Sequence, residues 1–126
     1  MAVPFNKNIN INNQRSIESE QALLACMLTD NNKIDDVIPI VKKEMFYSEF
    51  NALVWDKIVT LYKNGVPVDV TTVKSQLKNN DSPSGTPTYD ILKFFDHMTR
   101  ASNAVQYAKN VYEKAELRRL SDKATG

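Results

Sequence analysis

Apolar residues recur every three or four positions in six successive stretches of this 126-residue chain, and this spacing constrains the fold more than any other feature. Residues three or four positions apart lie on one face of a helix, so each stretch predicts a helix with one buried side. The first predicted helix covers about 17–29, the last runs from 103 to at least 121, and shorter helices lie between them. The pattern predicts an all-α fold, with a compact head of about five helices and a long C-terminal helix.

Capping and breaking residues separate the predicted helices. A side-chain oxygen just before a helix accepts a hydrogen bond from its first turn, and the residues placed to do this are Ser16, Ser48, Asp69 and Ser102. Pro39 kinks or ends the second helix because it lacks an amide hydrogen, and Gly65 can adopt the left-handed conformation that ends the third. The helix boundaries thus follow from local chemistry.

Two segments are rich in residues that disfavour regular structure. Asparagine dominates residues 6–13, and its side chain competes with the backbone for hydrogen bonds, so residues 1–15 are expected to form a mobile arm. Residues 79–88 are almost all turn formers and are expected to form an exposed, mobile loop. The expected organisation is an arm at 1–15, a helical head at 16–100 and a C-terminal helix at 101–126.

The aromatic residues of the head fall at helical spacing within apolar stretches. Phe46, Tyr47, Phe50 and Trp55 could form a platform for stacking nucleic-acid bases, but their place in the densest apolar segment favours the core. In the fifth predicted helix, the residues expected to face inward are Tyr89, Leu92, Phe95 and Met98.

The last predicted helix changes its apolar face near residue 116. One stripe contains Ala101, Ala104, Ala108, Val111, Tyr112 and Ala115. Leu117, Leu120 and Ala124 lie roughly 140 to 200 degrees away from Ala115 on the helical wheel. The first half is expected to pack on the head, and the second half needs a partner, which is either another chain or sequence beyond Gly126. The alternative is a frayed end with two exposed leucines.

Composition excludes several classes of function. The formal charge of +1 gives no field that would attract nucleic acid unaided, and the three glycines are too dispersed for a P-loop or a dinucleotide site. One cysteine and one histidine cannot form a zinc site, and the lone cysteine favours a reduced, intracellular setting. With no membrane span or signal peptide in the sequence, a soluble cytoplasmic protein is expected.

No catalytic or metal-binding residues stand out, and none are expected. His97 beside Asp96 lacks the partners of a catalytic pair, and Cys26 lies beside an apolar stripe, where it acts as a small hydrophobic residue. The acidic pairs Asp35-Asp36 and Asp90/Asp96 suit helix N-termini. The basic residues of the last helix alternate with acidic ones, which favours a solvated face over a nucleic-acid stripe.

Four segments of the chain carry a resemblance to a known family. They are Glu20–Leu28; Met45-Phe46-Tyr47 with Val54-Trp55; Gly65–Val73 with Leu77, in the pattern Gly-x-Pro-(Val/Ile)-Asp-x-x-Thr-Val; and Asn103–Ala108 continuing to Leu120. Together they resemble the N-terminal domain of replicative hexameric DNA helicases of the DnaB type. The family usually has glycine where this chain has Ala25 and histidine where it has Asn51, as in a divergent phage- or plasmid-encoded member.

The resemblance implies a helical head followed by the start of a helical hairpin, with six such domains pairing as a trimer of dimers in a collar. In the family, the collar stacks on RecA-like motor domains that bind ATP and Mg²⁺, and it docks primase and, in some systems, a helicase loader. No Walker motif occurs in this chain, so no ATPase or helicase activity is expected within it. The isolated chain is expected to be monomeric or weakly dimeric, because half of the hairpin is missing.

The residues expected at an interface with another subunit or partner are Tyr112, Leu117, Arg118 and Leu120. Two functions of other classes stay open at this point. The first is a stand-alone helical adaptor or helicase-loader-like interaction protein. The second is a module that binds single-stranded DNA, in which salt-dependent binding would depend on Arg118 and Arg119.

Overall fold

The computed structural model describes the backbone of residues 3–125 and the side chains of residues 13–122, and the described chain contains helices and no strand. The α-helices are α1 (Val3–Thr29), α2 (Asn32–Val37), α3 (Glu49–Lys63), α4 (Val70–Lys74), α5 (Pro87–Leu92) and α6 (Ala104–Thr125). Short 3-10 helices join them, namely η1 (Lys43–Met45), η2 (Asn79–Asp81), η3 (Lys93–His97) and η4 (Ala101–Asn103). The all-α prediction is confirmed.

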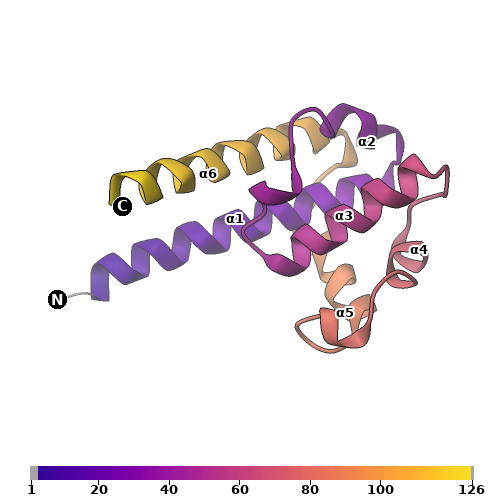
Figure 1. The fold of residues 1–126 in the computed structure, drawn as a ribbon, viewed down its shortest axis with the longest axis horizontal. Helices are drawn as coiled ribbons and strands as arrows, with labels where there is room; N and C mark the ends of the chain where they lie inside the picture. Colours follow the sequence, from indigo (N-terminus) through magenta and orange to yellow (C-terminus); the bar gives the residue numbers. More distant parts are fainter. Residues whose placement is uncertain (1–2, 126) are drawn as a thin grey trace.

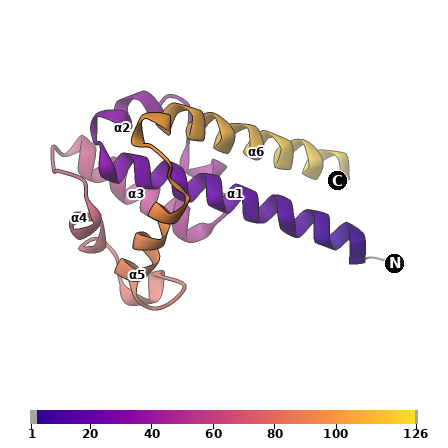
Figure 2. The same ribbon diagram turned by 180° about the vertical axis from the view of Figure 1, so that it is seen from behind.

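The first and last helices form the long axis of the molecule. They run antiparallel and side by side, while α3 packs on another side of α1 and the short helices α4 and α5 lie at one end (Figures 1 and 2). The core is one cluster of buried apolar side chains, to which all six α-helices and η3 contribute. No described helix combines the length and apolar character needed to cross a membrane.

Helix α1 begins much earlier than the sequence predicted. Its backbone is helical from Val3, so most of the segment expected as a mobile arm at 1–15 is helical instead. Proline is tolerated in a first helical turn, and neither proline nor glycine follows until after Thr29, so nothing in the sequence interrupts the helix. Ser16 is therefore not a cap: it lies inside α1, where its side chain is buried.

Two predicted caps are present, and the predicted breaks fall where expected. The Ser48 hydroxyl accepts a 3.2 Å hydrogen bond from the backbone N–H of Asn51 at the start of α3. The Asp69 carboxylate accepts a 2.8 Å bond from the Thr72 N–H, and the Thr72 hydroxyl accepts a 2.9 Å bond from the Asp69 N–H, which completes a capping box on α4. Gly65 has a φ of 75° after α3, and α2 ends before Pro39.

The predicted inward face of the fifth helix is wrong at two of its four positions. Tyr89 and Leu92 are more than half exposed, whereas Phe95 and Met98 are partly buried. The stripe that packs consists of Pro87, Ile91 and Phe94, which has the same helical spacing in a different register. Phe94 determines this register by packing against Phe50 of α3, with ring centroids 6.0 Å apart.

The segment 79–88, expected as a mobile loop, is ordered around Asp90. This carboxylate accepts hydrogen bonds from the Ser82 hydroxyl, from the Ser84 N–H at 3.0 Å and from the Ser84 hydroxyl at 2.9 Å. Burial acts to raise the pKa of Asp90, but these bonds outweigh it and leave the pKa below its usual value. At the start of α6 the 3-10 turn Ala101–Asn103 takes the place of the expected Ser102 cap.

Candidate functional site

The second half of α6 presents an apolar face that no other described part of the chain covers. Tyr112 is 43% exposed, Leu117 66% and Leu120 53%. On the other face of the same helix, Ala104, Ala108 and Val111 are buried in the core, as predicted. Leu117 and Leu120, about 60 degrees apart on the helix, define this uncovered apolar face, and Tyr112, which the wheel placed on the core stripe, is instead exposed at the edge of that stripe. The uncovered apolar face is the strongest candidate for a protein interface, because exposed apolar patches mark interaction sites. The Ala124 side chain lies outside the described residues.

Arg118, also expected at an interface, faces the chain's own head. Its guanidinium donates a 2.7 Å hydrogen bond to the Met45 carbonyl and a 3.2 Å bond to the Ser16 hydroxyl, and it lies 5.4 Å from the centroid of the Tyr47 ring. These contacts join α6 to η1 and α1. Arg118 therefore positions the uncovered apolar face relative to the head.

A buried carboxylate lies next to this anchor, and sequence reasoning missed its role. Glu20 on α1 is 1% exposed and accepts hydrogen bonds from the Tyr47 N–H at 2.6 Å, the Ser48 N–H at 3.3 Å and the Asn51 side chain at 3.0 Å. Burial raises the pKa of Glu20, although these bonds and the charge of Arg118 favour its ionised form. The sequence did indicate that Glu20 is buried, since Glu20 shares a helical face with Leu23, Leu24 and Met27.

The aromatic residues divide between the core and the surface. Phe46, Phe50 and Trp55 are buried, with the rings of Phe46 and Trp55 5.5 Å apart, so the core prediction is confirmed for these three. It is wrong for Tyr47, which is 43% exposed, because the backbone at Tyr47 turns inward to reach Glu20 and the ring lies outside against Arg118. Separated in this way, the four rings form no stacking platform.

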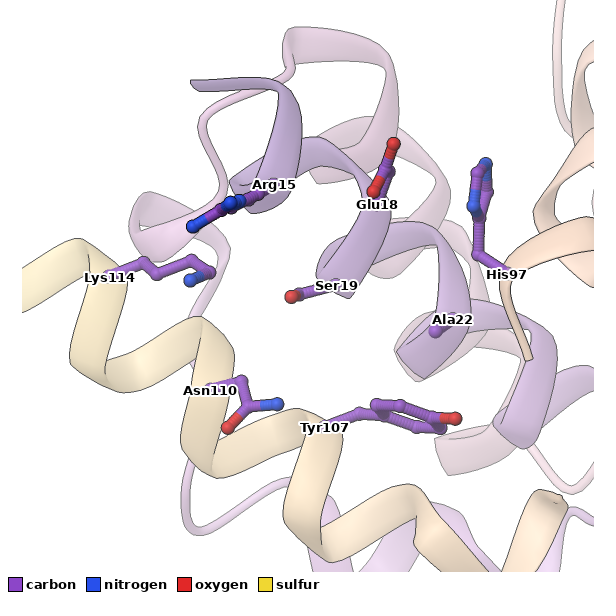
Figure 3. Close-up of a pocket in the computed structure, with 8 residues that line it drawn as sticks. All are labelled: Arg15, Glu18, Ser19, Ala22, His97, Tyr107, Asn110 and Lys114. Atoms are coloured by element: carbon purple, nitrogen blue, oxygen red, sulfur yellow. The ribbon is translucent and has the colours of Figure 1, made fainter. Parts of the chain in front are cut away.

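A polar pocket of about 280 Å³ lies between α1 and α6, beside η3. Figure 3 shows side chains from both helices around it, with Arg15 and Ser19 on α1 and Tyr107, Asn110 and Lys114 on α6. His97, the only histidine, lines the same pocket and is exposed. The sequence did not indicate this pocket, because its lining residues are about 90 positions apart.

The remaining chemically reactive residues are in unreactive settings. Cys26 is fully buried, and burial raises the pKa of its thiol to about 11, which disfavours the nucleophilic thiolate. Asp35 accepts a 2.6 Å hydrogen bond from the Tyr62 hydroxyl, and this bond raises the pKa of Tyr62. In the described chain, no group of three or more histidine, cysteine or acidic side chains could hold a metal ion.

The two arginines expected to bind nucleic acid, Arg118 and Arg119, are both engaged within the chain. Arg118 is engaged by Met45 and Ser16, and Arg119 forms a 3.0 Å ion pair with Glu116 on the same helix. Phosphate contacts need side chains that are available to the backbone of the nucleic acid. The geometry therefore favours a protein interface on α6 over a DNA-binding one.

Comparisons with known proteins agree on one family. The matching family description is "DnaB-like helicase N terminal domain", over residues 12–113. The replicative DNA helicase DnaB of Leifsonia xyli is 35% identical over 108 residues, which is 85% of this chain and 24% of the relative. The replicative DNA helicase DnaC of Bacillus subtilis is 31% identical over 113 residues, which is 88% of this chain and 25% of the relative. The chain thus spans about a quarter of the length of these relatives.

Solved structures show the same fold. The N-terminal domain of DnaB helicase from Mycobacterium tuberculosis superposes with a TM-score of 0.77 at 32% identity, covering 86% of this chain and 80% of that one. The corresponding domain from Helicobacter pylori gives a TM-score of 0.62 at 20% identity, covering 90% of this chain and 91% of that one. The second likeness concerns the fold alone.

Proposed function

The chain belongs to the family of DnaB-like helicase N-terminal domains, and on this basis we propose that it is the non-catalytic collar domain of a replicative DNA helicase. In this role it acts through protein contacts, mediating assembly of the hexamer and docking primase and a helicase loader. Because the chain spans about a quarter of its relatives' length, the proposal assigns strand separation to the remainder of such a protein.

The observation that carries the proposal is the uncovered apolar face of α6. Burying one large apolar side chain fully contributes about 1.5–3 kcal/mol, and Tyr112, Leu117 and Leu120 lie exposed on one helix. Arg118 holds this helix against the head, so the face is presented in one orientation before any partner arrives. Such preorganisation reduces the loss of conformational entropy when a partner binds.

ATP and Mg²⁺, which the family's motor domains use, do not fit the residues of this chain. Its glycines are dispersed, so no glycine-rich loop offers backbone amides to a phosphate chain. Mg²⁺ is usually held through carboxylates together with the nucleotide phosphates, and the described residues contain no such cluster. No ATP-dependent step is therefore assigned to this domain.

Primase is the proposed partner of the collar. Support comes from the Helicobacter pylori domain, whose structure was described together with its interactions with primase. Support from this chain is that Cys26 is buried and that Leu117 and Leu120 lie exposed on the surface of α6. A surface of this kind suits recognition of another protein.

Self-association of the 126-residue chain tests the assembly role. Sedimentation equilibrium at rising concentration should show a weak monomer–dimer equilibrium, and the double variant Leu117→Ser/Leu120→Ser should be monomeric throughout. Leu92→Ser, which changes a similarly exposed leucine on α5, is the matched control and should dimerise like the parent. Equal dimerisation by both variants would contradict the proposed role of α6.

Titration calorimetry with the primase of the same organism tests the docking role. Binding to the parent chain is expected, since the proposal places a primase site on this domain. If no heat of binding is detected when both proteins are well above the concentrations used in the self-association experiment, primase is not a partner of this domain.

A further inference from the structure

The pocket between α1 and α6 gathers two cations that have no anionic partner. Arg15 and Lys114 line it from opposite helices (Figure 3), and within the described part of the chain neither makes an ion pair or a hydrogen bond. Two like charges in one pocket repel each other, and an anion placed between them reverses the sign of that interaction. The arrangement therefore favours a negatively charged occupant.

Neutral donors lie in the same pocket. Ser19 contributes a hydroxyl from α1, and Asn110 contributes a side-chain amide from α6. The Asn110 carbonyl oxygen already accepts a 3.1 Å hydrogen bond from the Gln106 side chain, so its NH₂ group is the part left to donate. Together with the planar fork of Arg15, these donors suit the two oxygens of a carboxylate.

The pocket also limits how much negative charge it can accept. Glu18 lines it together with His97, accepts a 3.4 Å hydrogen bond from Gln14, and opposes a second anionic group close to the first. Ala22 and the ring of Tyr107 add apolar wall. A polyphosphate backbone would bring several charges at once, whereas an acidic side chain brings one charge on an apolar stem.

From these contacts we propose that the α1–α6 pocket binds a single glutamate or aspartate carboxylate presented by a peptide segment of a partner protein. Arg15 and Lys114 neutralise its charge, while Ser19 and Asn110 donate hydrogen bonds to its oxygens. Carboxylate binding in this pocket is independent of the proposed collar role, so either can fail without the other.

Chemical-shift titration of the ¹⁵N-labelled 126-residue chain at low salt tests this site. The probe is the capped peptide acetyl-Ala-Glu-Ala-amide, with its Gln counterpart as the neutral control. The Glu peptide should give saturable shifts centred on Ser19, Asn110 and Lys114, with a dissociation constant on the order of 1 mM, and the Gln peptide should bind at least about tenfold more weakly. Equal shifts from the two peptides would overturn the proposal.

Variants separate this pocket from general surface charge. Arg15→Ala and Lys114→Ala should each weaken binding of the Glu peptide about tenfold, whereas Lys109→Ala, an exposed cation on α6 outside the pocket, should leave it unchanged. Glu18→Gln should tighten it, which provides an independent test if a cation variant fails to fold. Unaltered binding in these pocket variants contradicts the site.

Two competitors distinguish the source of the anion. Inorganic phosphate and an oligothymidylate are titrated into the complex with the Glu peptide, and both should displace it only weakly. If the oligonucleotide displaces the Glu peptide at concentrations below those at which the Glu peptide itself binds, the occupant of the pocket is a nucleic-acid phosphate and not the proposed carboxylate.

Discussion

The Glu20 carboxylate on α1 accepts a 3.0 Å hydrogen bond from the side-chain amide of Asn51 on α3, and each residue is about 1% exposed. The same carboxylate accepts the backbone N–H groups of Tyr47 and Ser48, just ahead of α3. The buried Glu20 carboxylate thus links α1 to the start of α3 through three hydrogen bonds.

Replacing Glu20 with alanine should destabilise the fold strongly. The substitution leaves three buried or partly buried donors without an acceptor, and we expect the free energy of unfolding to fall by about 3 kcal/mol. Urea denaturation monitored by circular dichroism measures this free energy of unfolding. Glu18→Ala, two residues earlier on the same helix, is the control and should change little; equal losses in the two variants would show that the buried network is not the cause.

The stability contributed by Glu20 should depend on pH. Burial raises its pKa in the folded chain above the value in the unfolded chain, so the folded state holds the proton more tightly. Its contribution is then fully present below the unfolded pKa and is lost as the pH rises through the folded pKa. Urea unfolding of the parent chain, measured at pH values from the ordinary pKa of glutamate up towards neutrality, should show this decline in stability. Glu20→Gln, which cannot titrate, should lack it, and parallel profiles would contradict the shift.

Arg118→Ala should loosen α6 from the head. It removes two hydrogen bonds and the contact with the Tyr47 ring, and a loss of about 1–2 kcal/mol in unfolding free energy is expected. Arg118→Lys should be intermediate, since one ammonium group replaces the guanidinium fork. The neighbouring Arg119→Ala breaks only a surface ion pair and should leave the urea midpoint unchanged. A midpoint for Arg118→Ala equal to that of Arg119→Ala would refute the anchoring role.

The contribution of the α4 capping box to the stability of the fold should be measurable by itself. Asp69→Ala removes the acceptor for the Thr72 N–H and should cost about 1 kcal/mol, while Asp69→Asn should retain most of the stability. Asp36→Ala, an exposed aspartate on α2, serves as the matched control in the same thermal melts. If Asp69→Asn were as damaging as Asp69→Ala, charge rather than capping would explain the effect.

Cys26 should react with thiol reagents only when the protein opens. The side chain is buried and its pKa is raised to about 11, so little thiolate forms near neutral pH. Reaction with Ellman's reagent should be slow in buffer and fast in concentrated urea. Ser102→Cys places a second thiol at an exposed position and should give one immediate equivalent; an equally fast reaction of the parent chain would show that Cys26 is accessible.

Single-stranded DNA should not bind measurably to this chain, even at low salt. Arg118 is held by internal hydrogen bonds and Arg119 by Glu116, which leaves these two arginines with little to offer phosphates. Fluorescence anisotropy of a labelled oligothymidylate is the measurement. Salt-dependent binding that weakens in Arg118→Ala/Arg119→Ala would instead support the DNA-binding alternative.

Local chemistry explains which parts of the fold the sequence could predict. The caps at Ser48 and Asp69 and the glycine at Gly65 act within a few residues, so their roles follow from neighbours in the chain. The face of the α5–η3 segment was predicted wrongly because two stripes of equal spacing compete there. Only contact with Phe50, far away in sequence, selects Ile91 and Phe94 over Tyr89 and Leu92.

Long-range polar contacts explain what was missed at the candidate site. The uncovered leucines of α6 were predictable, because a change of helical face is visible in a wheel. The inward orientation of Arg118 was not, since its partners Ser16 and Met45 are 102 and 73 positions away. The same holds for the pocket, which exists only once α1 and α6 lie together.

The pairing of the first helix with the last has a consequence for synthesis on the ribosome. Part of the apolar side of α1 is covered by α6, so that part has no native partner until the last helix has emerged. Pairing of segments so distant in sequence is slow to form and leaves hydrophobic surface open to misassembly in the meantime. The nascent chain must therefore hold this surface exposed until α6 has been synthesised, and folding of these helices should complete only after release of the α6 segment from the exit tunnel.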